Sequence, residues 1–148
     1  MIWNMVSNDE SLRHWREFRS TLCELPIHAR LEAVALFFRN TPFGSRTLDY
    51  YSSENWPTPW EILYYGSFCK SSISLLIAYT LFMVDNECDI RLYLIDDRSD
   101  IYLIPAVRVE NTWYMLNYYL GEIIDINQIQ NEFSIIKEYN QIDLKKVR

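Results

Sequence analysis

The sequence predicts an α+β domain: N-terminal helices, a central buried helix packed on a three-stranded antiparallel meander, and a C-terminal helix. Apolar residues recur at helical spacing up to about residue 84. From Ile90 they alternate with the residues between them, which is typical of strands. Helical spacing returns after Asp125. Because helices, strands and a helix follow one another in blocks, the expected class is α+β.

The length of the chain limits the number of domains, and its charge limits the kinds of partner that it can bind. Its 148 residues fit a single domain, with a helical part at 1–40, a core at 58–119 and a C-terminal helix and tail at 125–148. The net charge of −6 repels phosphate backbones, so we expect no direct sequence-specific binding of nucleic acid. The apolar run at 73–84 is shorter than the roughly 17–25 residues of a membrane span, so we expect no membrane contact.

Two helices are predicted in the N-terminal part. Ser7 followed by Glu10 has the spacing of a capping box, which predicts a helix near 8–23. Pro26 suits the first turn of a second helix near 26–39.

An irregular stretch at 41–58 leads into a short third helix. Thr58 is a good N-cap, and Glu61 completes a capping box with it. This helix is expected to run to about Tyr65. Trp56 and the neighbouring Trp60 allow two interpretations, in which the rings pin the long loop to the core or form a platform for a partner.

The central helix is predicted at about 68–84, with Ser67 as its cap. It is apolar on nearly all sides, so it is expected to be buried on most of them. The period then changes, and turn residues separate three short apolar segments. These segments are the predicted strands of the meander, near 90–95, 101–109 and 112–118.

The predicted C-terminal helix begins at Asp125 as its N-cap. Its apolar stripe consists of Ile126, Ile129, Phe133 and Ile136. The flank of the stripe carries amides rather than charges, which predicts that the helix and tail lie at a contact with another protein. The other interpretation is that the stripe packs on the meander of its own chain.

Cys69 is the main candidate for chemistry. It falls in the first turn of the central helix, where free N–H groups and the helix dipole favour a thiolate. The other interpretation is a small, buried, unreactive side chain, which is common for cysteine. The chain has 3 cysteines and no CxxC pair, so we expect reduced thiols and no metal site.

The surroundings of Cys69 resemble those of a known family. Gly66, Ser67 and Phe68 precede the cysteine, and Trp113 begins a segment Trp-Tyr-Met-Leu-Asn that ends at Asn117. Together they resemble the transglutaminase-like branch of the papain-like cysteine enzymes. The resemblance implies a cysteine nucleophile at Cys69, with Asn117 in the place of the acid that orients a catalytic histidine.

The histidine of that family has no counterpart in the expected strand. Its position falls near Ile104, and no histidine follows His28 in the sequence. His14 and His28 lie on the predicted N-terminal helices. A thiolate needs a base or a paired cation, so the resemblance implies a degenerate, non-catalytic core.

A second resemblance concerns residues 41–66 and the Ile-, Asn- and Tyr-rich composition, which are similar to small tailed-bacteriophage proteins. We therefore expect a non-catalytic structural or assembly protein of a phage particle, located in the virion or the host cytoplasm. Its partners would be other protein subunits, such as head, neck or tail components, and no cofactor is expected. The alternative is a cysteine hydrolase or acyl-transferase that uses Cys69 and an atypical base. The expected partner-binding residues are Ile126, Ile129, Phe133, Ile136, Trp56 and Trp60.

Overall fold

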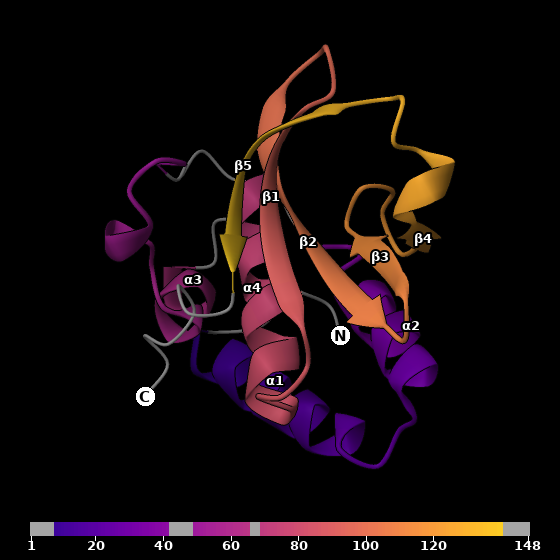
Figure 1. Ribbon diagram of the computed structural model, residues 1–148. Helices are drawn as coiled ribbons and strands as arrows, with labels where there is room; N and C mark the ends of the chain where they lie inside the picture. The colour runs from indigo at the N-terminus through magenta and orange to yellow at the C-terminus, as the bar shows by residue number, and fades with distance from the viewer. Residues whose placement is uncertain (1–7, 42–48, 66–68, 141–148) are drawn as a thin grey trace.

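Helices make up the first half of the chain, and an antiparallel sheet makes up the second half (Figure 1). The structure is a computed structural model that describes residues 8–41, 49–65 and 69–140. Its helices are α1 (Asn8–Leu22), α2 (Ile27–Phe37), α3 (Pro59–Tyr65) and α4 (Lys70–Val84), with short 3-10 turns η2 (Ser53–Asn55) and η3 (Ile126–Gln128). Its strands are β1 (Ile90–Asp96), β2 (Ile101–Val109), β3 (Thr112–Leu116), β4 (Ile123–Asp125) and β5 (Ser134–Asn140).

The sheet has five strands in the order β4-β3-β2-β1-β5, and every neighbouring pair is antiparallel. The predicted meander corresponds to β1, β2 and β3, and the α+β class is confirmed. The sheet is wider than predicted, because β4 extends it at one edge and β5 at the other. The chain between β4 and β5 crosses the whole sheet, as the yellow segment in Figure 1 shows.

Alternation along β1 places apolar side chains on both faces of the sheet. Leu92 and Leu94 join the main core between the sheet and α4. Tyr93 and Ile95 join a second core on the opposite face, which is completed by Ile129 and by other residues that follow β4. Both faces of the sheet are therefore covered, one by a helix and the other by the crossing segment.

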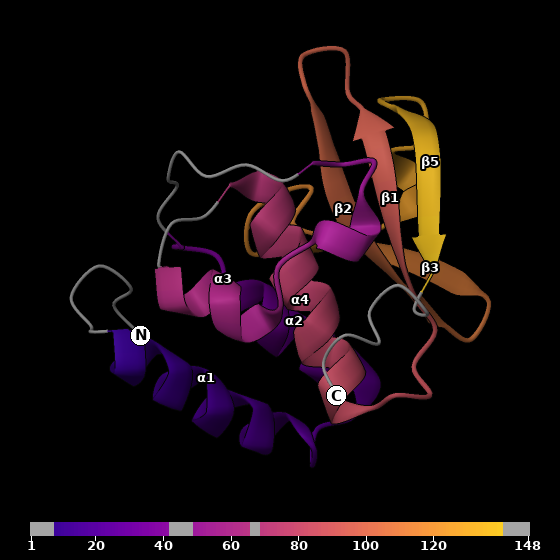
Figure 2. The same ribbon diagram turned by 90° about the vertical axis from the view of Figure 1, so that its left-hand side faces the viewer.

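Helix α4 is the centre of the main core. Residues 71–82 are all buried, as expected for a helix that is apolar on every side. Figure 2 shows α1 and α3 on one side of α4 and the sheet on the other. Two buried polar groups in this core satisfy each other, since the indole N–H of Trp15 donates to the hydroxyl of Thr80 over 2.9 Å. In the described part of the chain no helix is long and apolar enough to cross a bilayer.

The predicted C-terminal helix is wrong. Asp125 caps only the single turn η3, where its carboxylate accepts the Asn127 N–H over 2.9 Å. The chain then leads into β5, which pairs with the edge of β1 that β2 leaves open. Tertiary pairing outweighs helical spacing here, because Ile135, Ile136 and Tyr139 suit a strand at least as well as a helix.

The starts of the helices agree in part with the expected caps. Helix α2 begins one residue after Pro26, which is its N-cap. Helix α4 begins at Lys70 with Cys69 as its N-cap, whereas the predicted caps Ser67 and Ser7 lie outside the described residues. The capping box of α3 is confirmed: the Glu61 N–H donates to Thr58 Oγ1 over 3.2 Å, and the Thr58 N–H donates to Glu61 Oε1 over 3.0 Å.

Replacing Thr58 by Ala is expected to lower the free energy of unfolding by about 0.5–2 kcal/mol, because the side chain that caps α3 is lost. Urea unfolding of Thr58→Ala and the wild type measures this difference. Ser52→Ala is the matched control, since Ser52 precedes η2 and its side chain makes no capping bond. Equal midpoints for Thr58→Ala and Ser52→Ala would show that the capping box contributes nothing.

Candidate functional site at the start of α4

Cys69 holds the first turn of α4 together. Its extended backbone (φ −105, ψ 170) suits an N-cap, and its Sγ accepts the N–H of Ser72 over 3.3 Å. In return, Ser72 Oγ accepts the N–H of Cys69 over 2.8 Å. The thiol is half-buried, which corrects the expectation of full burial. Serine or threonine usually fills the first place of such a capping box, and here a cysteine does so.

Asn117 ties this turn to the sheet. It lies directly after β3 with a positive φ of 68°, and it is 4% exposed. Its Nδ2 donates to the carbonyl of Lys70 over 3.1 Å and to Ser74 Oγ over 2.9 Å. Asparagine tolerates this left-handed backbone better than most residues do, which explains the residue type at this turn. The residue that resembles the family's acid therefore acts here as a donor to α4.

A third tie links α4 to β2. Ser71 Oγ accepts the backbone N–H of Leu103 over 3.0 Å. Since Leu103 lies on the face that meets α4, the side chain of Ile101 lies on the same face, one step further toward the hairpin turn. Ile101 packs against the main core, while Leu103 is the β2 residue that bonds to the start of the helix.

Lys70 extends from the same turn to the other side of β2. Its Nζ donates to the carbonyl of Tyr118 over 3.3 Å and lies 4.1 Å from the centre of the Tyr102 ring. Burial lowers the pKa of Lys70, and Asp97 and Asp100 act in the opposite direction. Lys70 is not among the site residues predicted from the sequence, and its position next to Cys69 is the one sequence feature that points to it.

Two tyrosines near Lys70 bond to carboxylates. The Tyr102 hydroxyl donates to Asp97 Oδ2 over 2.7 Å, which holds the pKa of Asp97 below its usual value. The Tyr118 hydroxyl donates to Glu132 over 3.1 Å, and burial together with this bond raises the pKa of Tyr118 to about 12. Both phenols therefore stay protonated at neutral pH and act as donors.

The structure brings no histidine to Cys69 within the described residues, where the Sγ bonds to the Ser72 N–H. His28 lies on α2 with its ring 5.2 Å from that of Tyr114, edge to face. His14 lies on α1. Ile104, where the family's histidine was expected, belongs to the second core on the face away from α4. Its neighbour Leu103 faces α4 and bonds to Ser71 at the start of that helix.

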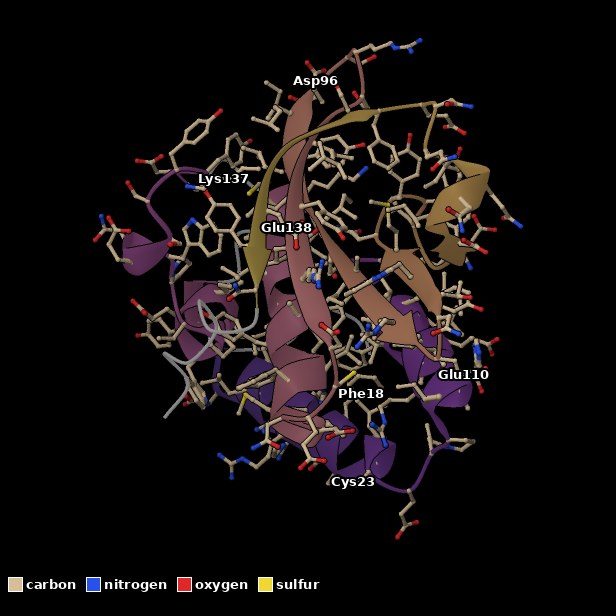
Figure 3. All side chains as sticks on the ribbon, in the orientation of Figure 1. Phe18, Cys23, Asp96, Glu110, Lys137 and Glu138 are labelled. Atoms are coloured by element: carbon tan, nitrogen blue, oxygen red, sulfur yellow. The ribbon has the colours of Figure 1, made fainter. Side chains whose placement is uncertain are left out.

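An open cavity of about 380 Å³ lies at the turn between β1 and β2. One wall is the turn between β1 and β2, and Tyr50 from the loop before α3 is on the other wall. Asp96 marks the hairpin end of β1 in Figure 3. The lining residues are Tyr50, Asp96, Arg98, Ser99, Asp100 and Ile101. Across the ranges 8–41, 49–65 and 69–140, no group of three or more His, Cys, Asp or Glu side chains could hold a metal ion.

The expected partner-binding aromatic residues differ in placement. Trp56 is buried, its Nε1 donates to the Asp49 carbonyl over 2.8 Å, and its ring centre lies 4.7 Å from that of Tyr139. These contacts favour the interpretation in which Trp56 pins the loop. Trp60 is 39% exposed, and its ring meets Trp15 edge to face.

The four stripe residues also differ in placement. Ile129 and Phe133 are buried in the second core, and Ile126 packs partly against it. Ile136 on β5 is 43% exposed. They therefore do not form one helical face, and partner binding by any of them stays a prediction.

Comparison with known proteins shows the fold. No protein-family model and no curated protein matches the chain. Two solved structures of Legionella pneumophila LapG, one of them EGTA-treated, superpose with a TM-score of 0.74 at 15% identity, over 90% of this chain and 75% and 74% of theirs. Calcium-bound LapG superposes with a TM-score of 0.66 at 14% identity, over 91% of this chain and 84% of its own. These similarities show that the chain shares the fold of LapG.

Replacing Asn117 by Ala is expected to lower the free energy of unfolding by about 2–4 kcal/mol. Two buried hydrogen bonds to α4 are lost, and alanine tolerates a positive φ poorly. Chemical denaturation measures the loss. Asn131→Ala is the control, because the exposed Asn131 contributes only its backbone carbonyl, to Arg98. A loss no greater than that of the control would mean that Asn117 does not hold α4.

Proposed function

We propose that this chain is a non-catalytic protein-interaction module, a structural or assembly protein that keeps a transglutaminase-like core. The observation that carries the proposal is the use of Cys69 Sγ as a helix cap, where it accepts the Ser72 N–H over 3.3 Å. Of the two residues that the family resemblance assigns to the catalytic arrangement, Cys69 caps α4 and Asn117 ties α4 to the sheet.

The chemistry of the site supports this proposal. A thiol becomes a nucleophile when a neighbouring base accepts its proton and a third group orients that base. In the described chain neither histidine bonds to the Cys69 thiol, and the amide of Asn117 donates to α4. The ammonium of Lys70 donates to the Tyr118 carbonyl, so this group is engaged as a cation. Among the residues that the structure describes, the Cys69 sulfur bonds to the Ser72 N–H and to no proton acceptor.

Exposed apolar side chains supply the means of contact with other proteins. Of the predicted contact residues, Trp60 on α3 and Ile136 on β5 are accessible. Large exposed apolar side chains also occur on α2, on the loop before α3, elsewhere on α3, on the turn after β3 and elsewhere on β5. They are Leu36, Tyr51, Tyr64, Tyr119, Leu120 and Ile135. The further proposal that the partners are phage head, neck or tail components rests on the sequence resemblance of residues 41–66.

A second candidate is a cysteine hydrolase or acyl-transferase. It is favoured by the half-buried thiol of Cys69 at the start of a buried helix, where the dipole stabilises a thiolate. The fold shared with LapG points in the same direction. In this alternative an atypical base takes the proton of the Cys69 thiol, and the sulfur attacks the acyl carbon. The bond from that carbon to the leaving group breaks, the leaving group takes up the proton, and Asn117 stays in the supporting position.

Alkylation of the native protein with iodoacetamide separates the two candidates. For the non-catalytic module we expect Cys23 to react first, because it is exposed at the end of α1, far from Asp96 in Figure 3. Cys88 should react slowest, because burial and Asp85 raise its pKa to about 11. Peptide mass spectrometry gives the three rates, and the unfolded protein is the control in which they converge. Reaction of Cys69 before Cys23 would favour the enzyme.

The assembly role is tested by sedimentation with particles. Wild-type protein is expected to co-sediment with phage particles assembled in cells that produce it. Trp60→Ala and Ile136→Ser should reduce the bound amount, because each removes an exposed apolar side chain. Gln130→Ser, on the exposed crossing segment, is the control. Absence of wild-type protein from the particle fractions would rule out the virion role.

A further inference from the structure

One side chain of β5 reaches back to the loop before α3. In β5 only Tyr139 is buried, and the other six residues are exposed. Its hydroxyl donates to the carbonyl of Tyr50, and its ring packs on Trp56 at 4.7 Å with an interplanar angle of 65°. The last described strand and a loop 89 positions earlier are thus joined at one point.

The loop at 49–56 is a closed unit around this point. Trp56 Nε1 donates to the Asp49 carbonyl over 2.8 Å, which joins the two ends of the loop. Inside it, the Tyr51 N–H donates to Asp49 Oδ1 over 3.1 Å and the Ser52 N–H to the Asp49 carbonyl over 3.3 Å. A unit closed in this way shifts largely as a whole, so its place depends on what Trp56 and Tyr50 contact.

The position of this unit sets one wall of the cavity at the β1–β2 turn. Tyr50 lines the cavity opposite the β1–β2 turn, and Ile101 lines it on the side of the main core. The Tyr50 carbonyl is the group that Tyr139 holds. A change at Tyr139 therefore acts directly on the residue that bounds the cavity.

Strand β5 is held weakly by its own side chains. It pairs with β1 at the sheet edge, with a register shift between Leu94 and Ile95. The ion pair of Arg91 with Glu138, at 2.8 Å, lies at the surface. Edge strands with few buried side chains open at lower free energy than the centre of a sheet. Strand β5 can therefore separate from the sheet edge, and Tyr139 connects it to the loop that bounds the cavity.

We propose that β5 is a latch for the cavity wall. When β5 is paired with β1, Tyr139 holds the loop at 49–56 and the cavity keeps its shape. When β5 leaves the edge, the loop loosens and the cavity opens. Because coupling between two sites is reciprocal, a molecule that fixes the loop also stabilises β5. This inference goes beyond the proposed function and holds for either of the two candidate functions.

Hydrogen exchange of the full chain tests the latch. In Tyr139→Phe, exchange of the amides of Asn55 and Trp56 should speed up about fivefold, as expected for one lost hydrogen bond. In Tyr139→Ala it should rise more than tenfold, because the ring contact with Trp56 is also lost. Amides of β2 should keep their wild-type rates. Tyr119→Phe is the control, since Tyr119 bonds to Glu132 at an exposed site.

The reciprocal variant completes the test. Trp56→Leu should speed exchange at residues 134–140 about fivefold or more, although Trp56 lies outside β5. Unchanged loop exchange in Tyr139→Phe would overturn the latch, as would unchanged β5 exchange in Trp56→Leu. An equal rise at 101–109 would also overturn it, because it would indicate general loosening. If Tyr139→Ala does not fold, Tyr139→Phe and Trp56→Leu decide the matter.

Discussion

The burial of α4 is the constraint on which the rest of the structure depends. A helix surrounded by protein cannot leave its first N–H groups to water, so they need partners within the chain. Cys69 and Ser72 satisfy each other at the helix start, and Asn117 fixes the same turn to the sheet. The ties that resemble a catalytic arrangement are therefore also the ties that a fully buried helix requires. Cys69 and Asn117 are therefore both explained by the needs of the buried helix within the described residues.

The sheet is completed by the segment after β4, for which the sequence pattern predicts a helix. Strands β1 to β3 form a meander, which leaves one face and two edges open. The segment after β4 covers the open face with Ile129 and Phe133, and β5 then takes the edge of β1. One stretch of about fifteen residues thus covers both the open face of the sheet and the open edge of β1. This explains why it contains a turn, buried anchor residues and a strand.

Local signals were predictable, whereas pairing over long distances was not. Thr58 and Glu61 identified α3, and apolar runs located α4 and β1 to β3, because caps and periodicity act between neighbours. The spacing of Ile129 and Phe133 was read as helical, although these residues are anchors in an irregular segment. Whether Ile101 or Ile104 faces α4 depends on register, and a shift of one residue exchanges the two faces. The cap by Cys69 and the contacts of Lys70 required the tertiary structure.

The pairing of β5 with β1 has a consequence for synthesis on the ribosome. The chain emerges from its N-terminus, so β1 and its apolar edge are complete about forty residues before β5 exists. Until residue 140 has left the exit tunnel, the edge of β1 that includes Leu92 and Leu94 has no β5 to pair with. Contacts such as Tyr139 with Tyr50, 89 positions apart, close last and slow the search for the native state. The nascent domain is therefore most exposed to misassembly, and most dependent on chaperones, between the appearance of β1 and that of β5.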